Sequence, residues 1–470
     1  MHRCLLPLIT VFCLLLGRAP AEAGPLLDPT WGIGGVHRLT ALGGRVEGIG
    51  SCPHMDGSVS VIGFRTTTAS LVIVRLTAGG QLDTRFSGDG IAELAVLQAF
   101  DVGRSAVSCA GVGNSVPEDD RAMVVATSPG STHDVAIAAL LDLHTGGFDS
   151  GFYLGGPGAY DLGGLLFPPQ NQVRLYPRLR VQGVFPGPAA GWLIVGRLEG
   201  HASGVPAGFI AQVNPAGAVD ALAQPNVGGF TSRNLSAARV GADGYIRALA
   251  DGNFGGGYTW GLLRLDPATL QPAALSDHGV ADIFTIELSK GRQIGGGLMV
   301  VAALQYDQSA FGSSPRLLVV RGDEANEIAL PAVPPVDGVA LGPSGLPGSA
   351  AATGAVGNRA VFAMGLNSLD QGSAGYYVSV VQLGDGAGTP DVVDTRFGRD
   401  GAGSFRYRPA PTSCAGTATP PQRFANLASW GERTLLVGTV APDCAPTADG
   451  AILSARLLTD GDTLHRSGFE

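Results

Sequence analysis

The stretch Leu82–Ile91, LDTRFSGDGI, is the clearest copy of a block that recurs along the chain. Related blocks begin at Leu27, Phe148, Val219 and Val393. Their aspartates, Asp28, Asp83, Asp149, Asp220 and Asp394, are separated by 55, 66, 71 and 174 residues. The last gap holds three periods of about 58 residues, so two weaker copies are expected within it. A period of this size, filled with short apolar runs, indicates a propeller or a solenoid built from one repeated unit.

Two families of apolar runs accompany these blocks, and each family has seven members. One set begins at Ser58, Arg121, Trp192, Tyr245, Gly297, Arg359 and Arg433. The other begins at Leu71, Val135, Gly208, Trp260, Arg316, Tyr376 and Ala451. Their β-branched and aliphatic residues, bounded by Gly, Asp and Pro, are typical of strands buried on both faces. We therefore predict seven repeated units of β-strands.

The two ends of the repeat complement one another. The first block has no strands before it, whereas the seventh unit runs out soon after its third strand. If residues 33–39 form the outer strand of the last blade, the ring closes without an open sheet edge. The prediction is an all-β, seven-bladed β-propeller that forms a single domain over residues 24–470. A β-solenoid of seven coils is the alternative, but it leaves the terminal fragments unexplained and lacks end caps.

Within each block, local hydrogen bonding explains the residue types. The aspartate can accept bonds from backbone amides two and three residues on, the glycines permit positive φ, and the aromatic residue can pack beneath the corner. This pattern resembles the delta-60 repeat family of bacterial exported proteins, most closely in LDTRFSGDGI and in VDTRFGRDGA from Val393. The resemblance implies propeller-like units and no shared catalytic residues.

The N-terminus carries the features of a secretory signal peptide over residues 1–23. Arg3 precedes an apolar stretch from Cys4 to Leu16, and Ala21-Glu22-Ala23 supplies a cleavage pattern. The apolar stretch is shorter than the 20 or so residues of a transmembrane helix, and no later segment qualifies. The formal charge of −9 argues against nucleic-acid binding. We therefore expect a secreted or periplasmic protein.

Four cysteines remain after cleavage near Ala23, and an even number in an oxidising compartment favours disulfides. Cys414 and Cys444 flank the first two strands of blade seven at the same end, which predicts a bond between them. Cys52 and Cys109 lie on the innermost strands of neighbouring blades, which predicts a second. Two buried thiols are the alternative for this second pair.

The sequence contains no motif that identifies catalytic, cofactor-binding or metal-binding residues. Gly-x-Ser-x-Gly, HExxH and CxxC are absent from the sequence. Calcium is the one cofactor left open, because Glu118-Asp119-Asp120 and the turn with Asp323, Glu324 and Glu327 gather carboxylates. Neither cluster has the spacing of a calcium loop, so both are interpreted as surface turns.

The segment Gly252–Trp260 combines aromatic residues with glycines, as sugar-binding surfaces do. Phe254 and Tyr258 are the candidate ligand-face aromatics, because both are expected in the exposed connection between second and third strands. The leading hypothesis is an exported, non-catalytic propeller that binds an envelope glycan or a protein partner, or serves as a scaffold. A hydrolase or lyase with its site at the propeller channel is one alternative. A structural surface protein is another.

Overall fold

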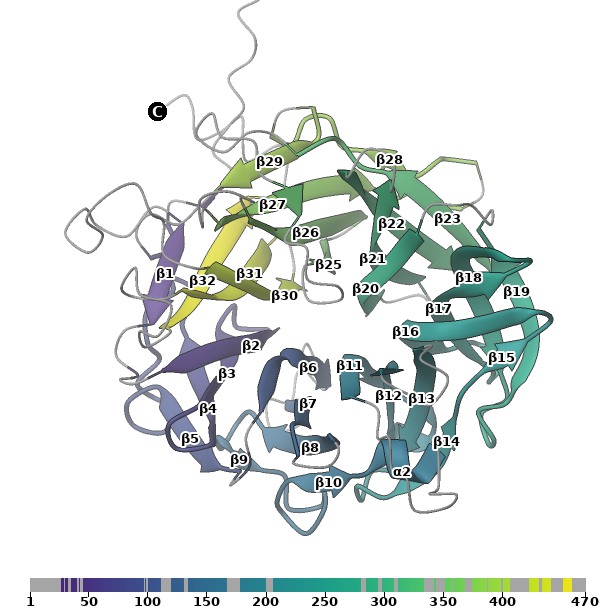
Figure 1. The fold of residues 1–470 in the computed structure, drawn as a ribbon. Helices are drawn as coiled ribbons and strands as arrows, with labels where there is room; N and C mark the ends of the chain where they lie inside the picture. The colour runs from purple at the N-terminus through teal and green to yellow at the C-terminus, as the bar shows by residue number, and fades with distance from the viewer. Residues whose placement is uncertain are drawn as a thin grey trace, which may run out of the picture.

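The fold is a ring of antiparallel sheets, seen down its axis in the computed structural model (Figure 1). The structure describes residues 27–458 except 29, 33–34, 40–41, 43–44, 97, 99, 111–119, 131–133, 167–177, 200–205, 280–284, 295–297, 308–311, 334–341, 344–350, 357, 368–373, 387, 399, 406–421, 431–432 and 441–450. All structural statements concern these residues.

The first three blades follow the chain in order, each with its first strand innermost. Blade one holds β2 (Val46–Pro53), β3 (Val59–Arg65), β4 (Ser70–Leu76) and β5 (Ile91–Ala95). Blade two holds β6 (Asp101–Ala110), β7 (Arg121–Ser128), β8 (Val135–Asp142), β9 (Gly147–Phe148) and β10 (Gly158–Tyr160). Blade three holds β11 (Arg178–Pro186), β12 (Trp192–Glu199), β13 (Ala207–Val213) and β14 (Val219–Ala223). A short helix, α2 (Leu162–Leu166), and a 3-10 turn, η2 (Pro188–Ala190), lie between these strands.

The remaining blades continue the same plan. Blade four holds β15 (Asn226–Val227), β16 (Phe230–Val240), β17 (Ile246–Phe254), β18 (Gly257–Leu265) and β19 (Pro272–His278). Blade five holds β20 (Thr285–Ile294), β21 (Leu298–Asp307), β22 (Gly312–Arg321) and β23 (Glu324–Ala329). Blade six holds β24 (Gly342–Pro343), β25 (Ala351–Val356), β26 (Arg359–Asn367), β27 (Ala374–Gln382), β28 (Val392–Val393) and β29 (Ala402–Phe405). Blade seven holds β30 (Gln422–Trp430), β31 (Arg433–Val440), β32 (Ala451–Leu458) and β1 (Val36–Leu39).

The ring closes through the N-terminal strand, as the sequence predicted. β1 pairs antiparallel with β32, with Val36 opposite Ala455 and Leu39 opposite Ile452, and Figure 1 shows the purple β1 beside the yellow β32. This pairing covers the edge that β32 would otherwise expose. The seven-bladed propeller is confirmed, and the solenoid alternative is wrong because the first and last segments share one sheet.

The core lies between the blades rather than within any one of them. β3, for example, buries six of its seven residues because both faces of its sheet pack against neighbouring blades. One apolar cluster joins Ile62 of blade one to Val124 of blade two. Another joins Leu193, Leu263 and Val301 of blades three, four and five. This two-sided burial explains the continuous apolar runs in the sequence.

Four of the recurrent blocks form the corner expected from their residue types. In each, the aspartate accepts a hydrogen bond from the backbone amide two residues on, at 2.9 Å for Asp28, 3.2 Å for Asp83, 2.9 Å for Asp149 and 3.2 Å for Asp394. The aromatic residues beneath these corners, Trp31, Phe86, Phe152 and Phe397, are buried. The closing glycines, Gly35, Gly90, Gly155 and Gly401, have φ between 79° and 92°. The block at Val219 is different, because it runs directly into β14, and Asp220 accepts a hydrogen bond from the Asn214 side chain instead.

Arginines near the ends of third strands tie some blades to the next blade. The guanidinium groups donate to the turn that follows the third strand of the next blade, from Arg75 to Leu143 O (2.8 Å), from Arg321 to Gly384 O (3.1 Å) and from Arg456 to Ala78 O (2.7 Å). Each bond crosses a blade junction in the same direction around the ring.

Among the described residues, no helix is long and apolar enough to cross a membrane.

Candidate functional site

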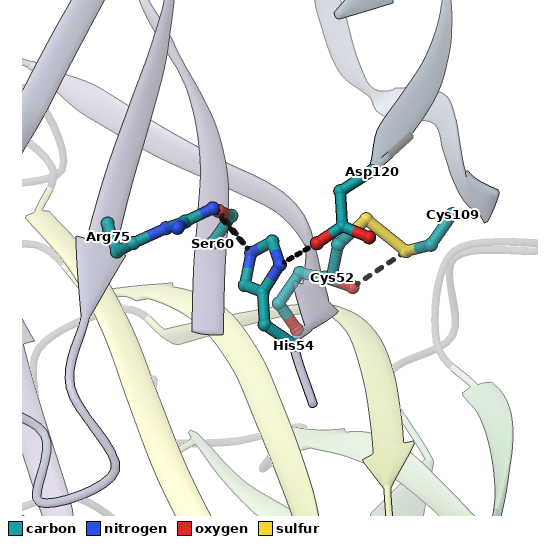
Figure 2. Close-up of a disulfide and its surroundings, with 7 residues drawn as sticks. Cys52, His54, Ser60, Arg75, Cys109 and Asp120 are labelled. Atoms are coloured by element: carbon teal, nitrogen blue, oxygen red, sulfur yellow. Dashed lines mark hydrogen bonds and ion pairs between the residues drawn. A yellow bond between two sulfur atoms is a disulfide. The ribbon is translucent and has the colours of Figure 1, made fainter. Parts of the chain in front are cut away.

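The junction between blades one and two contains the disulfide predicted from the sequence (Figure 2). Cys52 on β2 and Cys109 on β6 are bonded, with their Cα atoms 5.6 Å apart, inside the range that disulfides require. The bond joins the innermost strands of adjacent blades. Cys414 and Cys444 lie outside the described residues, as does the signal peptide, so that pairing stays a prediction.

A buried histidine lies beside this disulfide and connects the two blades. His54 Nδ1 is 2.5 Å from Asp120 Oδ2, and His54 Nε2 is 2.8 Å from Ser60 Oγ. Asp120 belongs to blade two, immediately before β7, whereas His54 and Ser60 belong to blade one. Their exposed fractions are 5% for His54, 5% for Asp120 and 0% for Ser60.

The tight turn between β2 and β3 holds His54 in this position. The backbone amide of His54 donates to Ser58 O at 2.9 Å, and the amide of Ser58 donates to Asp56 Oδ1 at 2.9 Å. Gly57 completes the turn with φ of 81°, a conformation that glycine adopts without steric cost. Local turn chemistry therefore presents the imidazole to the neighbouring blade.

The distances from Ser60 through His54 to Asp120 match those of a nucleophilic serine triad. However, Arg75 Nη2 also lies 2.9 Å from His54 Nε2, and a guanidinium can only donate. Nε2 therefore accepts from Arg75, and Nδ1 carries the proton that is donated to Asp120. With its lone pair engaged and Ser60 sealed from solvent, the imidazole has no route to a substrate in this conformation. The cluster acts as a bridge between blades.

The same surroundings set the charge of His54. Burial lowers the pKa of His54, and the positive charge of Arg75 lowers it further. Hydrogen bonding to Asp120 and the charges of Asp120 and Asp56 act in the opposite direction. Because the pKa is lowered overall, the imidazole is neutral at neutral pH, which agrees with its role as an acceptor from Arg75.

The candidate aromatics Phe254 and Tyr258 lie on strands rather than in the connecting loop, which consists of Gly255 and Gly256. The expectation that both occupy an exposed loop is therefore wrong, and both rings are half-buried. Phe254 is opposite Gly257 in the β17–β18 pairing, so Tyr258 lies one residue further along and on the other face of the hairpin. The two rings do not form a common platform.

Each ring has its own partners. The Phe254 ring lies 4.4 Å from that of His278, an exposed residue at the end of β19. The Tyr258 hydroxyl donates to Asp251 Oδ1 at 2.6 Å, and Asn234 Nδ2 donates to the other oxygen of Asp251 at 3.0 Å. We call residues 228–234 and 251–258, with His278, the blade-four edge. It combines aromatic rings with polar groups near the surface.

The acidic clusters around Asp120 and Asp323 were considered above as calcium sites. Some of their carboxylates bind other side chains within and between blades. Asp120 bonds to His54, and Asp323 accepts from Arg247 Nε at 2.5 Å. Glu327 accepts from Trp260 Nε1 at 3.0 Å. Glu118 and Asp119 lie outside the described residues. In the described part of the chain, no three His, Cys, Asp or Glu side chains are grouped so as to hold a metal ion.

A hollow of about 350 Å³ lies between the outer turns of blades five and six. Arg321, Glu324, Asn326, Thr389 and Asp391 contribute to its lining. Arg321 is already engaged by both oxygens of Asp391, at 2.6 and 2.7 Å, and by Gly384 O. The basic group in this hollow is therefore committed to holding the two blades together.

Comparisons with known proteins give fold-level similarities only. No family model matches the chain, and no curated protein matches it. A catalytically inactive virginiamycin B lyase from Staphylococcus aureus with quinupristin is similar at 10% identity, with a TM-score of 0.41, over 89% of this chain and 98% of the other. The polysaccharide lyase Uly1 has 11% identity, a TM-score of 0.39 and coverage of 88% and 90%. The GH93 α-L-arabinofuranosidase of Fusarium graminearum with arabinobiose has 9% identity, a TM-score of 0.40 and coverage of 75% and 92%. At these values, no activity or substrate is carried over to this chain.

Proposed function

We propose that this chain is an exported propeller that binds an envelope glycan at the blade-four edge without catalysing a reaction. The observation that carries the proposal is the contact between Phe254 and the exposed His278, which places a half-buried aromatic face beside a polar side chain at the surface. Sugar rings stack on such faces, because they present apolar C–H groups as well as hydroxyls. The Gly255–Gly256 turn leaves the approach to this surface open.

Export is supported by two independent features. The N-terminal sequence has the charge, apolar stretch and small residues of a signal peptide. The Cys52–Cys109 bond fits an oxidising compartment, since structural disulfides are rare in the cytosol. A protein partner, rather than a glycan, is the alternative ligand for an exported ring of this kind.

The binding proposal is tested by thermal shift of the mature protein against fragments of peptidoglycan and of capsular and plant polysaccharides. A ligand at a hundred times its dissociation constant adds about 2.7 kcal/mol to the free energy of unfolding. Phe254→Ala should weaken the shift, whereas Tyr153→Ala, at a 44% exposed aromatic of blade two, should not. Absence of a shift with every glycan would overturn the proposal.

The alternative of a serine hydrolase has one specific observation in its favour, the Ser60–His54–Asp120 geometry. If the protein is a serine hydrolase, a fluorophosphonate probe should label Ser60, and the label should be lost in Ser60→Ala. If Ser60 is only part of a buried bridge between blades, the folded protein should not be labelled. Labelling at Ser60, detected by peptide mass spectrometry, would favour the enzyme over the binding module.

A further inference from the structure

Arg233 occupies an irregular position at the blade-four edge. The pairing of β16 with β17 shifts register between Ser232 and Asn234, so Arg233 is the extra residue of a β-bulge. Bulges interrupt the alternation of a strand and redirect a side chain. In this case the guanidinium carbon lies 5.3 Å from the centre of the Tyr258 ring.

Among the residues that the structure describes, the guanidinium of Arg233 has no anionic partner. It makes no hydrogen bond or ion pair with any residue that the structure describes, and its Nε is buried without an acceptor. By contrast, Arg85, Arg247, Arg321 and Arg456 each contact a carboxylate. A half-buried charge without a counter-charge costs free energy, and the Tyr258 ring compensates only part of that cost.

Tyr258 is fixed in place beneath this charge. Its hydroxyl donates to Asp251, which is buried and also accepts from Asn234. The ring therefore presents a defined face to Arg233 rather than rotating away. The fixed Tyr258 ring and the Arg233 guanidinium therefore lie on the same side of the hairpin.

The surroundings of Arg233 are open to a ligand. Two exposed Gly-Gly turns, Gly228–Gly229 and Gly255–Gly256, end the strands on either side, and all four glycines have positive φ. A side chain added at any of them would meet no atom within 4 Å. Thr231, between these turns, is exposed. Among the described residues, these turns therefore leave open space on either side of Arg233.

We propose that Arg233 and Tyr258 form a subsite for the anionic group of an acidic glycan, a uronate carboxylate or a sulfate ester. The inference rests on the proposed glycan binding at the blade-four edge and adds a second contact, on the face opposite Phe254, that specifies the charge of the glycan. Arginine binds carboxylate and sulfate oxygens through paired N–H donors, and the Tyr258 ring is placed to contact the sugar. The whole chain has a formal charge of −9, so attraction of a polyanion depends on this local cation.

The test is isothermal titration calorimetry of the full mature protein with three oligosaccharide sets. These are oligogalacturonates, the same oligomers after reduction of their carboxyl groups, and sulfated dextran oligomers. Preference for either acidic set over the reduced set is expected, and the two acidic sets distinguish carboxylate from sulfate. Affinity should fall with added salt, because screening weakens exposed charge interactions.

Three variants locate the binding at the subsite. Arg233→Gln should weaken acidic binding by about tenfold to a hundredfold, the usual range for a lost hydrogen bond to a charged group. Arg233→Lys should recover only part of the affinity, because lysine lacks the planar fork. Arg85→Gln, at an arginine of the blade-one corner with a 79% exposed side chain, is the matched control and should bind as the unaltered protein does.

Each failure has a distinct meaning. Equal affinity for acidic and reduced oligomers, or full acidic binding by a folded Arg233→Gln, would overturn the subsite while leaving the proposed glycan function standing. Binding of no oligosaccharide, in calorimetry and in the wider thermal-shift panel, would overturn both. Circular dichroism and unfolding temperature establish that each variant is folded before binding is compared.

Discussion

Asp28 and Arg456, 428 residues apart in the sequence, form a partly buried ion pair in which Arg456 Nε donates to Asp28 Oδ2 at 2.7 Å. The backbone amide of Asp28 also donates to Arg456 O at 2.9 Å. The same guanidinium donates to Ala78 O of blade one and lies over the Trp31 ring. One side chain thus joins the N-terminal block, the last blade and the first blade, so the ring closes through side chains as well as through β1.

Substitution Asp28→Asn should therefore destabilise the whole ring. Burial alone would raise the pKa of Asp28, but hydrogen bonds from Thr30 and the charge of Arg456 lower it overall, so the carboxylate is charged in the folded protein. Losing this charge-assisted pair should lower the free energy of unfolding by about 1.5 to 3 kcal/mol. Urea unfolding measures the change. Asp89→Asn is the control, at an exposed residue that accepts a hydrogen bond from the amide of Ile91 within its own turn. An equal loss in both variants would contradict the closure role.

The corner glycines offer a second test, within a single block. Gly88 and Gly90 have nearly the same φ, 86° and 87°, so alanine at either position should cost about 1 to 2 kcal/mol of backbone strain. A side chain at Gly88 meets open space, whereas one at Gly90 would lie 3.2 Å from the Leu82 side chain and 3.3 Å from the Asp83 backbone. Gly90→Ala should therefore melt at a lower temperature than Gly88→Ala. The reverse order in differential scanning calorimetry would argue against a packed corner.

The corners also explain why the fold was predictable from the sequence. An aspartate, an aromatic residue and a positive-φ glycine interact within eight residues. The conformation of each corner is therefore determined by its local sequence and can be recognised from it. Seven pairs of apolar runs then gave the number of blades, and the unmatched ends predicted the pairing of β1 with β32. Blades three, four and five lack this corner among the described residues, because their third and fourth strands join through short turns. This explains why the two copies expected between Asp220 and Asp394 are not recognisable as blocks.

The candidate sites were less accessible to sequence reasoning. His54 and Asp120 are 66 residues apart and meet only because two blades pack together, and nothing in either local sequence signals the other. Arg233 acquires its position from a bulge, which breaks the period of two on which strand predictions rest. The separation of Phe254 and Tyr258 on opposite faces, however, follows from a two-glycine turn and simple alternation, and could have been derived.

The Cys52–Cys109 bond should contribute strongly to stability. It closes a loop with a sequence separation of 57, for which the chain-entropy model gives about 4 kcal/mol. The double variant Cys52→Ala with Cys109→Ala should unfold at lower guanidinium concentration than the unaltered protein under oxidising conditions. Adding a reductant to the double variant isolates any contribution from Cys414 and Cys444. An unchanged midpoint in the double variant would mean that inter-blade packing alone holds the junction.

The buried His54 should make the junction between blades one and two sensitive to acid. The unfolded imidazole has an ordinary pKa of 6.5, and the folded pKa is lower because of burial and the charge of Arg75. Between these two values the unfolded chain binds the proton more readily, so the free energy of unfolding falls as pH decreases through this window. Above pH 6.5 the contribution of His54 to the free energy of unfolding is complete.

The variant His54→Gln tests this prediction. Glutamine retains donor and acceptor groups but does not titrate, so the unfolding midpoint of the variant should depend less on pH between about pH 5 and pH 8. Stability that rises with acid would instead indicate a protonated His54 paired with Asp120, and would refute a neutral imidazole that accepts from Arg75.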